Sequence, residues 1–296
     1  MAKHSTVGGA PLRGYVVNLE RSVNRRHHMR RELRKARFDV EFVTAVDGRQ
    51  LDITDPQLVS PELQSRPSFR AGSAGCALSH LEIYRRVLAA ELEHVVVMED
   101  DIVIPPDMDA LCTEVARGMR GAGVVLLNYH GKRGATRLVQ QGSRGLAGSR
   151  VLADVADEAS STGCYMITRE ACKRILAGQS VLVAFPDQWA YFYRQGWIES
   201  LQCVAPMPVM NSPELRTSID HFKHDSLKAR IREIISESKL PVVHQVLAMR
   251  RRRSFQKRGW AGEVEFVDER TLRAPGDGAA VDVEPPEMPA APARHS

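Results

Sequence analysis

The sequence lacks any long apolar segment. Among its 296 residues, no run approaches the roughly 18 consecutive apolar residues that a membrane-spanning helix needs. Residues 1–13 are small and polar, with Gly8 and Gly9 in their middle, and they lack the apolar stretch of a secretory signal. The sequence therefore predicts a cytoplasmic protein that does not cross a bilayer.

Cysteine is scarce, and its distribution excludes two kinds of chemistry. The five cysteines are odd in number and widely spaced, and no Cys-x-x-Cys pair indicates a zinc or redox site. We expect all of them, Cys76 included, to be ordinary buried thiols. Internal repeats are also missing at periods of about 20 to 50 residues, which excludes solenoids and propellers.

Positive charge is present in excess, but it is local. The formal net charge is +5, and eight Arg or Lys residues lie within residues 21–37. A second cluster, Arg250–Arg258, follows a predicted amphipathic helical segment at residues 227–249. That order is typical of a contact with an anionic membrane surface, so peripheral binding at the inner face of the cytoplasmic membrane is one interpretation. A solvated tail is the other.

Short apolar runs alternate with helical patterns, and this order predicts an α/β fold with a mostly parallel, Rossmann-like sheet flanked by helices. Two β-α-β units open the chain. We expect the strands at residues 15–19, 40–43, 94–98, 124–127, 164–167 and 198–204, and the helices at residues 23–37, 74–88, 107–120, 169–177 and from 186 onward. Thr168 is placed to cap the fourth of these helices. The glycine-rich residues 132–150 read as a mobile loop.

These elements divide the chain into four parts. We expect a flexible N-terminus at residues 1–12, one α/β domain at residues 13–215 and a helical, basic segment at residues 216–260. Residues 261–296 are rich in Pro, Ala and acidic residues, which predicts a disordered tail.

Three consecutive acids, Glu99, Asp100 and Asp101, follow the strand at residues 94–98. Their mutual repulsion at a strand's carboxyl end requires a compensating cation. Oxygen ligands of this kind suit Mn²⁺ or Mg²⁺, which bridges carboxylates to a nucleotide-sugar diphosphate. Taken alone, the triplet is equally compatible with a solvated acidic turn that leads into Pro105 and Pro106.

Four segments occur in one order around this triplet, and together they resemble glycosyltransferase family 25. The segments are Asn18–Arg26, Gly72–His80, Val97–Asp101 and Ser161–Tyr165. The resemblance covers about residues 13–213. It implies a GT-A fold, a UDP-sugar donor, usually UDP-galactose, and an inverting transfer that makes a β-linked product. The acceptor that it implies is a cell-surface glycan such as the core of bacterial lipopolysaccharide or lipooligosaccharide.

The resemblance also suggests roles for individual residues. Glu99 and Asp101 are the expected metal ligands, with Asp100 beside the donor. The nucleotide and its diphosphate are expected to be positioned by Asn18, Arg21, Arg25, Ser79 and His80. The guanidinium groups and the free amides at a helix start are natural partners of phosphate oxygens. For His80, a structural role inside the helix is the alternative.

Inversion needs a carboxylate that deprotonates the acceptor hydroxyl, and Asp187 is the prediction. It follows Pro186 in a segment similar to the family's Pro-x-Asp-Trp pattern, but Gln188 here precedes the tryptophan. Asp187 would otherwise cap the following helix. Asp157 and Glu158 are the alternative bases, and Trp189 is the predicted acceptor platform, although aromatic residues near a helix start also serve as core.

Two further functions remain open at this point. A catalytically silent relative would bind nucleotide sugar or glycan without chemistry. A nucleic-acid-binding protein would use the two basic clusters, but no recognition module is evident and aromatic residues do not interleave with the basic ones, so we expect no nucleic acid.

Overall fold

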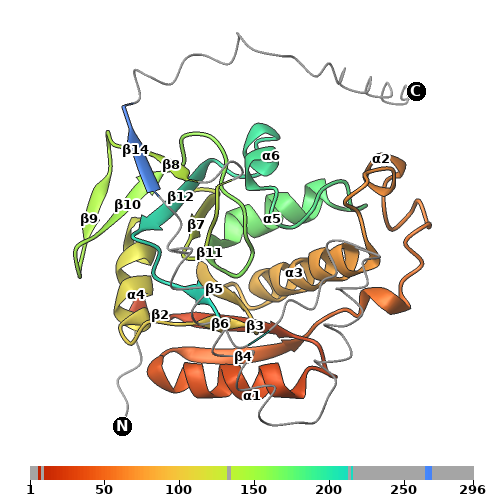
Figure 1. The fold of residues 1–296 in the computed structure, drawn as a ribbon, viewed down its shortest axis with the longest axis horizontal. Coiled ribbons are helices and arrows are strands. Elements are labelled where there is room, and N and C mark those ends of the chain that lie inside the picture. Colours follow the sequence, from red (N-terminus) through yellow and green to blue (C-terminus); the bar gives the residue numbers. More distant parts are fainter. Residues whose placement is uncertain (1–5, 8–9, 132–134, 213–214, 216–263, 269–296) are drawn as a thin grey trace, which may run out of the picture.

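The structure, a computed structural model, describes residues 6–7, 10–131, 135–212, 215 and 264–268. Its centre is an eight-stranded sheet in the order β4-β3-β5-β11-β7-β12-β10-β9 (Figure 1). The strands of this sheet are β3 (Arg13–Asn18), β4 (Asp39–Thr44), β5 (His94–Glu99), β7 (Gly123–Leu126), β9 (Arg144–Leu146), β10 (Arg150–Asp154), β11 (Cys164–Thr168) and β12 (Ser200–Ala205). Within this sheet, β10 and β11 run against the direction of the others.

Helices cover both faces of the sheet. On one side lie α1 (Val23–Glu32) and α4 (Met108–Gly118), and on the other lie α3 (Ala71–Ala89), α5 (Arg169–Gly178) and α6 (Trp189–Arg194). The middle of strand β5, residues 95–98, is apolar at every position because both of its faces are buried. Val95 and Val97 pack on the α3 side, whereas Val96 and Met98 pack on the α4 side, so both faces are buried.

Short elements complete the described fold. Three pairs of strands lie outside the central sheet: β1 (Thr6–Val7) with β2 (Ala10–Pro11), β6 (Ile102–Val103) with β13 (Met210–Asn211), and β8 (Thr136–Val139) with β14 (Val264–Val267). The short helices are η1 (Leu33–Lys35), η2 (Gly48–Gln50) and α2 (Pro61–Gln64). No helix in the described ranges has the length and apolarity to span a bilayer.

The predicted α/β architecture is confirmed, with a mostly parallel sheet between helices. The first β-α-β unit is present, since β3 and β4 are parallel neighbours. Thr168 caps α5 as predicted, because its hydroxyl accepts a hydrogen bond from the amide of Ala171 at 3.2 Å. The predicted helix at residues 23–37 ends its α-helical part at Glu32 and continues as η1.

Three expectations need correction. Strands β5 and β7 are not neighbours, because β11 enters between them and pairs antiparallel with both. The glycine-rich stretch at residues 132–150 contains β8 and β9 rather than loop alone. Within the predicted disordered tail, Val264–Val267 forms β14 and pairs in parallel with β8. The predicted helices at residues 227–249 and the basic run Arg250–Arg258 lie outside the described residues.

Glycines allow the start of α3 to approach the loop after β4. A Cβ atom on Gly75 would lie 2.6 Å from the carbonyl oxygen of Val46 and 2.7 Å from the amide nitrogen of Gly48. Both contacts are with backbone atoms, which cannot rotate away as a side chain can. The close approach brings the loop at Val46–Gly48 against the helix that carries Cys76, Ser79 and His80.

We predict that Gly75→Ala lowers the free energy of unfolding by roughly 1–3 kcal/mol, because the added methyl group overpacks this contact. The sign is diagnostic, since alanine inside a helix is otherwise favoured over glycine by about 1 kcal/mol. Urea denaturation followed by circular dichroism measures the change. Gly145→Ala is the control, because a Cβ there meets no atom within 4 Å. Equal stability of Gly75→Ala and wild type would contradict the packing argument.

Candidate functional site

A cavity of about 480 Å³ lies where β3, β4 and β5 end and α3 begins. Its walls come from the loop after β3, the loop after β4, the first turns of α3 and the end of β5. The polar side chains that line it are Arg21, Arg25, Asp47, Arg49, Arg70, Cys76, Ser79, His80, Glu99 and Asp100. The carboxyl ends of parallel strands are where open α/β sheets collect ligands.

Glu99 and Asp100 of the acidic triplet form one wall, and Arg25 from α1 holds Asp100 and the adjacent Asp101. The guanidinium of Arg25 lies 2.5 Å from Oδ1 of Asp100 and 2.9 Å from Oδ2 of Asp101. Asn18, the last residue of β3, donates from Nδ2 to Oδ2 of Asp100 at 2.6 Å. Asn18, Arg25 and Asp100 thus form one buried network across two neighbouring strands.

Glu99 is the last residue of β5 and is half-buried at the cavity wall. The hydroxyl of Thr162 donates to its Oε1 at 2.5 Å. Burial, followed by the charge of Asp101, raises the pKa of Glu99 to about 7. Burial also raises the pKa of Asp101, although Arg25 opposes the shift. One guanidinium therefore does not fully compensate three adjacent carboxylates.

Arginines surround the rest of the cavity. Asp47 forms ion pairs with Arg21 and with Arg49, whose guanidinium lies 2.7 Å from its Oδ2. The hydrogen bonds from Arg49, followed by the positive charges of Arg21 and Arg49, lower the pKa of Asp47 to about 2. Arg70 donates to the carbonyl oxygens of Pro67 and Phe69. Arg21, Arg25, Arg49 and Arg70 together give the cavity the donors and positive charge that suit an anionic ligand.

Ser79 and His80 both line the cavity from α3, and their polar groups are engaged differently. Ser79 Oγ accepts from the amide of Val46 at 2.8 Å and donates to the carbonyl of Gly75 at 2.6 Å, so it ties the helix to the loop after β4. His80 Nδ1 lies 2.8 Å from the hydroxyl of Tyr165, which lies 2.8 Å from that of Tyr84. Burial lowers the pKa of His80 to about 4, so its imidazole is neutral at neutral pH.

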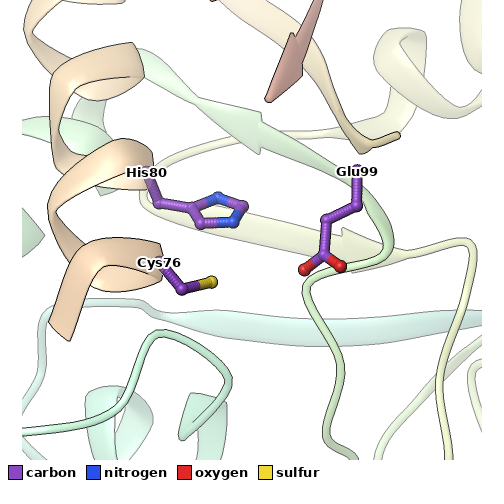
Figure 2. Close-up of side chains that lie close together, drawn as sticks. All are labelled: Cys76, His80 and Glu99. Carbon is purple, nitrogen blue, oxygen red and sulfur yellow. The ribbon is translucent and has the colours of Figure 1, made fainter. Parts of the chain in front are cut away.

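Cys76, predicted from the sequence to be a core thiol, lines the cavity. It lies one helical turn before His80, and its thiol points into the cavity toward His80 and Glu99 (Figure 2). The three donor atoms lie within 4.8 Å of one another. The four-residue spacing in the helix placed Cys76 and His80 on one face, but it could not show that this face lines a cavity. Thr162, Tyr165, Asp47, Arg49 and Arg70 were missed as well.

Asp187 lies in the turn before α6 and is half-buried. Burial, followed by the negative charges of Glu99 and Asp187, raises the pKa of the Cys76 thiol, so Asp187 lies within electrostatic range of Cys76 but is not among the residues that line the cavity. The helix cap is Gln188 rather than Asp187. Asp157, an alternative base, is exposed and lies 3.9 Å from Arg137, while the amide of Glu158 donates to Asp157.

Trp189, the predicted acceptor platform, is fully buried and presents no ring face to solvent. Its ring packs edge-on against Tyr165 with 4.9 Å between the centroids, and its indole N–H donates to the carbonyl of Ser161 at 2.8 Å. Trp189 therefore supports the cavity from behind, through the segment that carries Thr162. Its large apolar ring fills the core between α6 and the sheet.

The predicted site for a divalent ion agrees with the donors present. Oδ1 of Asp101 is buried, and the described part of the chain offers it no hydrogen-bond partner. Burial is the main cause of the raised pKa values of Glu99 and Asp101; the charge of Asp101 adds to the shift of Glu99, and that of Asp100 adds to the shift of Asp101. A cation bound to these carboxylates would relieve the repulsion between them. Carboxylate oxygens of this kind fit Mn²⁺ or Mg²⁺.

The family model of glycosyltransferase family 25, described as LPS biosynthesis protein, matches residues 12–187. The chain belongs to this family, and the resemblance seen in its four segments is confirmed. The match includes every residue that lines the cavity, from Val17 to Asp100, and it ends at Asp187.

The chain matches only part of the length of each of its relatives. The chain is 33% identical over 226 residues to a glycosyltransferase 25 family member of Aedes aegypti, which is 73% of this chain and 33% of the relative. It is 35% identical over 96 residues to human procollagen galactosyltransferase 2, 30% of this chain and 15% of the relative. An inactive glycosyltransferase 25 family member 3 of Mus musculus is 27% identical over 67% of this chain and 36% of the relative.

The chain thus spans about a third of the Aedes aegypti relative and less of the human relative. A solved glycosyltransferase involved in the glycosylation of the major capsid of PBCV-1 is 10% identical to it, with a TM-score of 0.31, over 71% of this chain and 86% of that one.

The raised pKa of Glu99 makes a prediction about stability without metal. In the folded protein the pKa of Glu99 is about 7, above the usual 4.5. The contribution of Glu99 to the free energy of unfolding is therefore fully present below pH 4.5 and is lost as the pH rises through 7. In the presence of a chelator, Glu99→Gln should therefore gain stability over wild type across this range, by roughly 1–3 kcal/mol.

Urea denaturation at a series of pH values measures this gain. Glu62→Gln, at an exposed glutamate of α2, is the control and should follow wild type. Added Mn²⁺ should narrow the difference between Glu99→Gln and wild type, because a bound cation favours the ionised carboxylate. A difference that does not change with pH would contradict the burial of Glu99.

Proposed function

We propose that the protein transfers a hexose, galactose from UDP-galactose, to a glycan acceptor with inversion at the anomeric carbon. The observation that carries this proposal is that Glu99, Asp100 and four arginines line one cavity, with Asp101 paired to one of these arginines, Arg25. Membership of glycosyltransferase family 25 supports a transferase, and the human relative's name supports galactose as the sugar. The donor and the acceptor are the proposed parts.

In this proposal the diphosphate of UDP lies among Arg21, Arg25, Arg49 and Arg70. Planar guanidinium groups pair with phosphate oxygens in two directions, and they hold the donor without forming a covalent bond. Asn18 and Asp100 fix the position of Arg25, and His80 faces the donor as a neutral group. Glu99 and Asp101 would hold Mn²⁺ or Mg²⁺, which supplies charge stabilisation for a leaving diphosphate.

Asp187 is the proposed general base. It removes the proton from the acceptor hydroxyl while that oxygen attacks the anomeric carbon from the face opposite UDP. The bond to the diphosphate breaks as the new glycosidic bond forms, which inverts the configuration. The effect of its charge on Cys76 supports a place beside the cavity, whereas the alternative base Asp157 is exposed and lies near Arg137.

We propose a cell-surface glycan such as lipopolysaccharide core as the acceptor, because the family model is described as an LPS biosynthesis protein. Work at the inner face of the cytoplasmic membrane, with Arg250–Arg258 against anionic lipid, fits this acceptor. Trp189 has no part in acceptor binding in this proposal, since its ring is buried.

A silent relative is the second candidate, and the inactive mouse relative favours it. Such a protein would bind the donor in the same cavity without turnover. Donor hydrolysis separates the two functions, because a bound UDP-sugar in an active site is slowly lost to water, whereas a silent site leaves it intact.

We predict that UDP-galactose raises the Tm only when Mn²⁺ or Mg²⁺ is present. Asp101→Ala should abolish this shift, because it removes the carboxylate with the unpartnered oxygen. Differential scanning fluorimetry over a set of UDP-sugars measures the effect, and Asp157→Ala is the matched control. If no nucleotide sugar shifts the Tm, or if Asp101→Ala responds as wild type does, the proposed donor site is wrong.

We predict that Asp187→Asn lowers kcat by about 10²- to 10⁴-fold, the range for loss of a general base. The Kd for UDP-galactose should stay within about twofold, since Asp187 is placed on the acceptor side. Release of UDP measured with an acceptor glycan gives kcat, and calorimetry gives Kd. Asp157→Asn serves as the control. A large loss in Asp157→Asn with none in Asp187→Asn would reverse the assignment.

A further inference from the structure

The cavity contains a second group of metal-binding side chains that differs in chemistry from the acidic triplet. Cys76 and His80 project from successive turns of α3, and Glu99 faces them from the end of β5 (Figure 2). Their donor atoms are a sulfur, a nitrogen and an oxygen, all within 4.8 Å of one another. The metal site proposed above for the transferase, Glu99 and Asp101, needs neither a thiol nor an imidazole as a ligand.

The imidazole of His80 is an independent indication of a ligand. The side chain is 1% exposed, and its Nε2 finds no hydrogen-bond partner among the described residues. Leaving a buried polar atom unpaired costs roughly 1–3 kcal/mol, so such an atom in a cavity is a sign of something it binds. The ring presents this side to Cys76 and Glu99 (Figure 2).

The opposite nitrogen of the same ring is fixed. Nδ1 of His80 lies 2.8 Å from the hydroxyl of Tyr165, and that hydroxyl lies 2.8 Å from the hydroxyl of Tyr84. When Nδ1 carries the proton and donates a hydrogen bond to the hydroxyl of Tyr165, Nε2 presents its lone pair to the cavity. Metal-binding histidines are held in this way by a hydrogen bond from the nitrogen that does not bind the metal.

We propose that Cys76, His80 and Glu99 form a binding site for a divalent ion of the zinc type, with its fourth position open to the cavity. A thiolate, an imidazole and a carboxylate are the ligands that Zn²⁺ prefers, whereas Mg²⁺ and Mn²⁺ prefer oxygen alone. The site is therefore distinct in selectivity from the pair Glu99 and Asp101, although the two share Glu99.

The geometry needs only small movements. Zn²⁺ lies about 2.3 Å from sulfur and about 2.0–2.2 Å from nitrogen and oxygen, which puts tetrahedral donors roughly 3.5 Å apart. The donors of Cys76, His80 and Glu99 lie within 4.8 Å, so shifts on the order of 1 Å close the site. Rotation of the Cys76 side chain and of the Glu99 carboxylate provides them, while Thr162 holds Oε1 of Glu99.

Because Glu99 belongs to both sets, an ion at this site competes with the ion of the transferase. Zn²⁺ would therefore inhibit transfer, and this consequence rests on the proposed function. The binding itself does not, so binding and inhibition are tested separately.

The test is a titration of the full chain, freed of metal, with Co²⁺, a spectroscopic substitute for Zn²⁺. We expect a thiolate-to-cobalt charge-transfer band that saturates at one ion per chain and disappears when Zn²⁺ is added. Cys76→Ser should lose the band. Tyr165→Phe, which keeps the ring and removes only the hydroxyl beside His80, should weaken Co²⁺ binding about 10- to 100-fold. Cys203→Ser, at a buried thiol in β12, is the control and should bind as wild type does.

Three results would overturn the proposal: no charge-transfer band in wild type, an unchanged band in Cys76→Ser, or equal displacement of Co²⁺ by Mg²⁺ and by Zn²⁺. Circular dichroism checks that each variant is folded. If Cys76→Ser or Tyr165→Phe is not folded, His80→Gln, which removes the imidazole ligand and should also weaken Co²⁺ binding, takes its place. Inhibition of UDP-galactose hydrolysis by Zn²⁺ forms the second part. Co²⁺ binding without any hydrolysis of UDP-galactose would support the metal site and contradict the proposed transferase function.

Discussion

The Arg25 guanidinium lies between Asp100 and Asp101, and the form of the cavity depends on this contact. It joins α1 to the end of β5, with Asn18 of β3 completing the network. All of these groups are largely removed from water, so their desolvation costs much of what their attraction provides. Loss of either partner would leave a buried charge uncompensated, at a cost of about 3–5 kcal/mol. The network is thus a constraint on geometry more than a source of stability.

The same contact leaves uncompensated negative charge beside the positive charge of the arginines that line the cavity. Arg25 brings one positive charge to three adjacent carboxylates, and burial, together with the repulsion that remains, raises the pKa values of Glu99 and Asp101. A divalent ion removes that repulsion, while the outer arginines are paired to Asp47 or to backbone carbonyls in ways that a phosphate group can replace. A metal and a diphosphate together would balance the charges of both walls.

The order of strands and helices could be predicted from the sequence, because short apolar runs buried on both faces have a distinct pattern. The insertion of β11 between β5 and β7 could not, since Cys164–Thr168 has the same pattern whichever neighbours it has. Strands β8 and β14 escaped prediction for another reason. Each is short and depends on a partner more than 100 residues away along the chain, which local composition does not reveal.

At the site, charged residues were easier to predict than their supports. Glu99, Asp100, Asp101 and Arg25 stand at element ends, where the pattern points to ligands, and the structure brings them together. Cys76 was assigned to the core because a thiol inside an apolar helix is normally packed there. Trp189 was predicted to be an acceptor platform because a flat aromatic ring suits a sugar, whereas the ring is buried in the core, the alternative that its place near a helix start had left open.

Several side chains form one layer behind the cavity, and this layer restricts how the donor groups of the site can move. Tyr84 and Tyr165 fix the ring of His80, while Trp189 holds the carbonyl of Ser161 next to Thr162, which fixes Glu99. Tyr165 and Trp189 also pack against each other, so the supports of His80 and Glu99 are one unit. Donors held in this way cannot spread to fit any ion or sugar, because moving one of them disturbs a packed aromatic core. In the proposed function, the selectivity of this cavity would therefore depend on buried rings that do not contact the ligand.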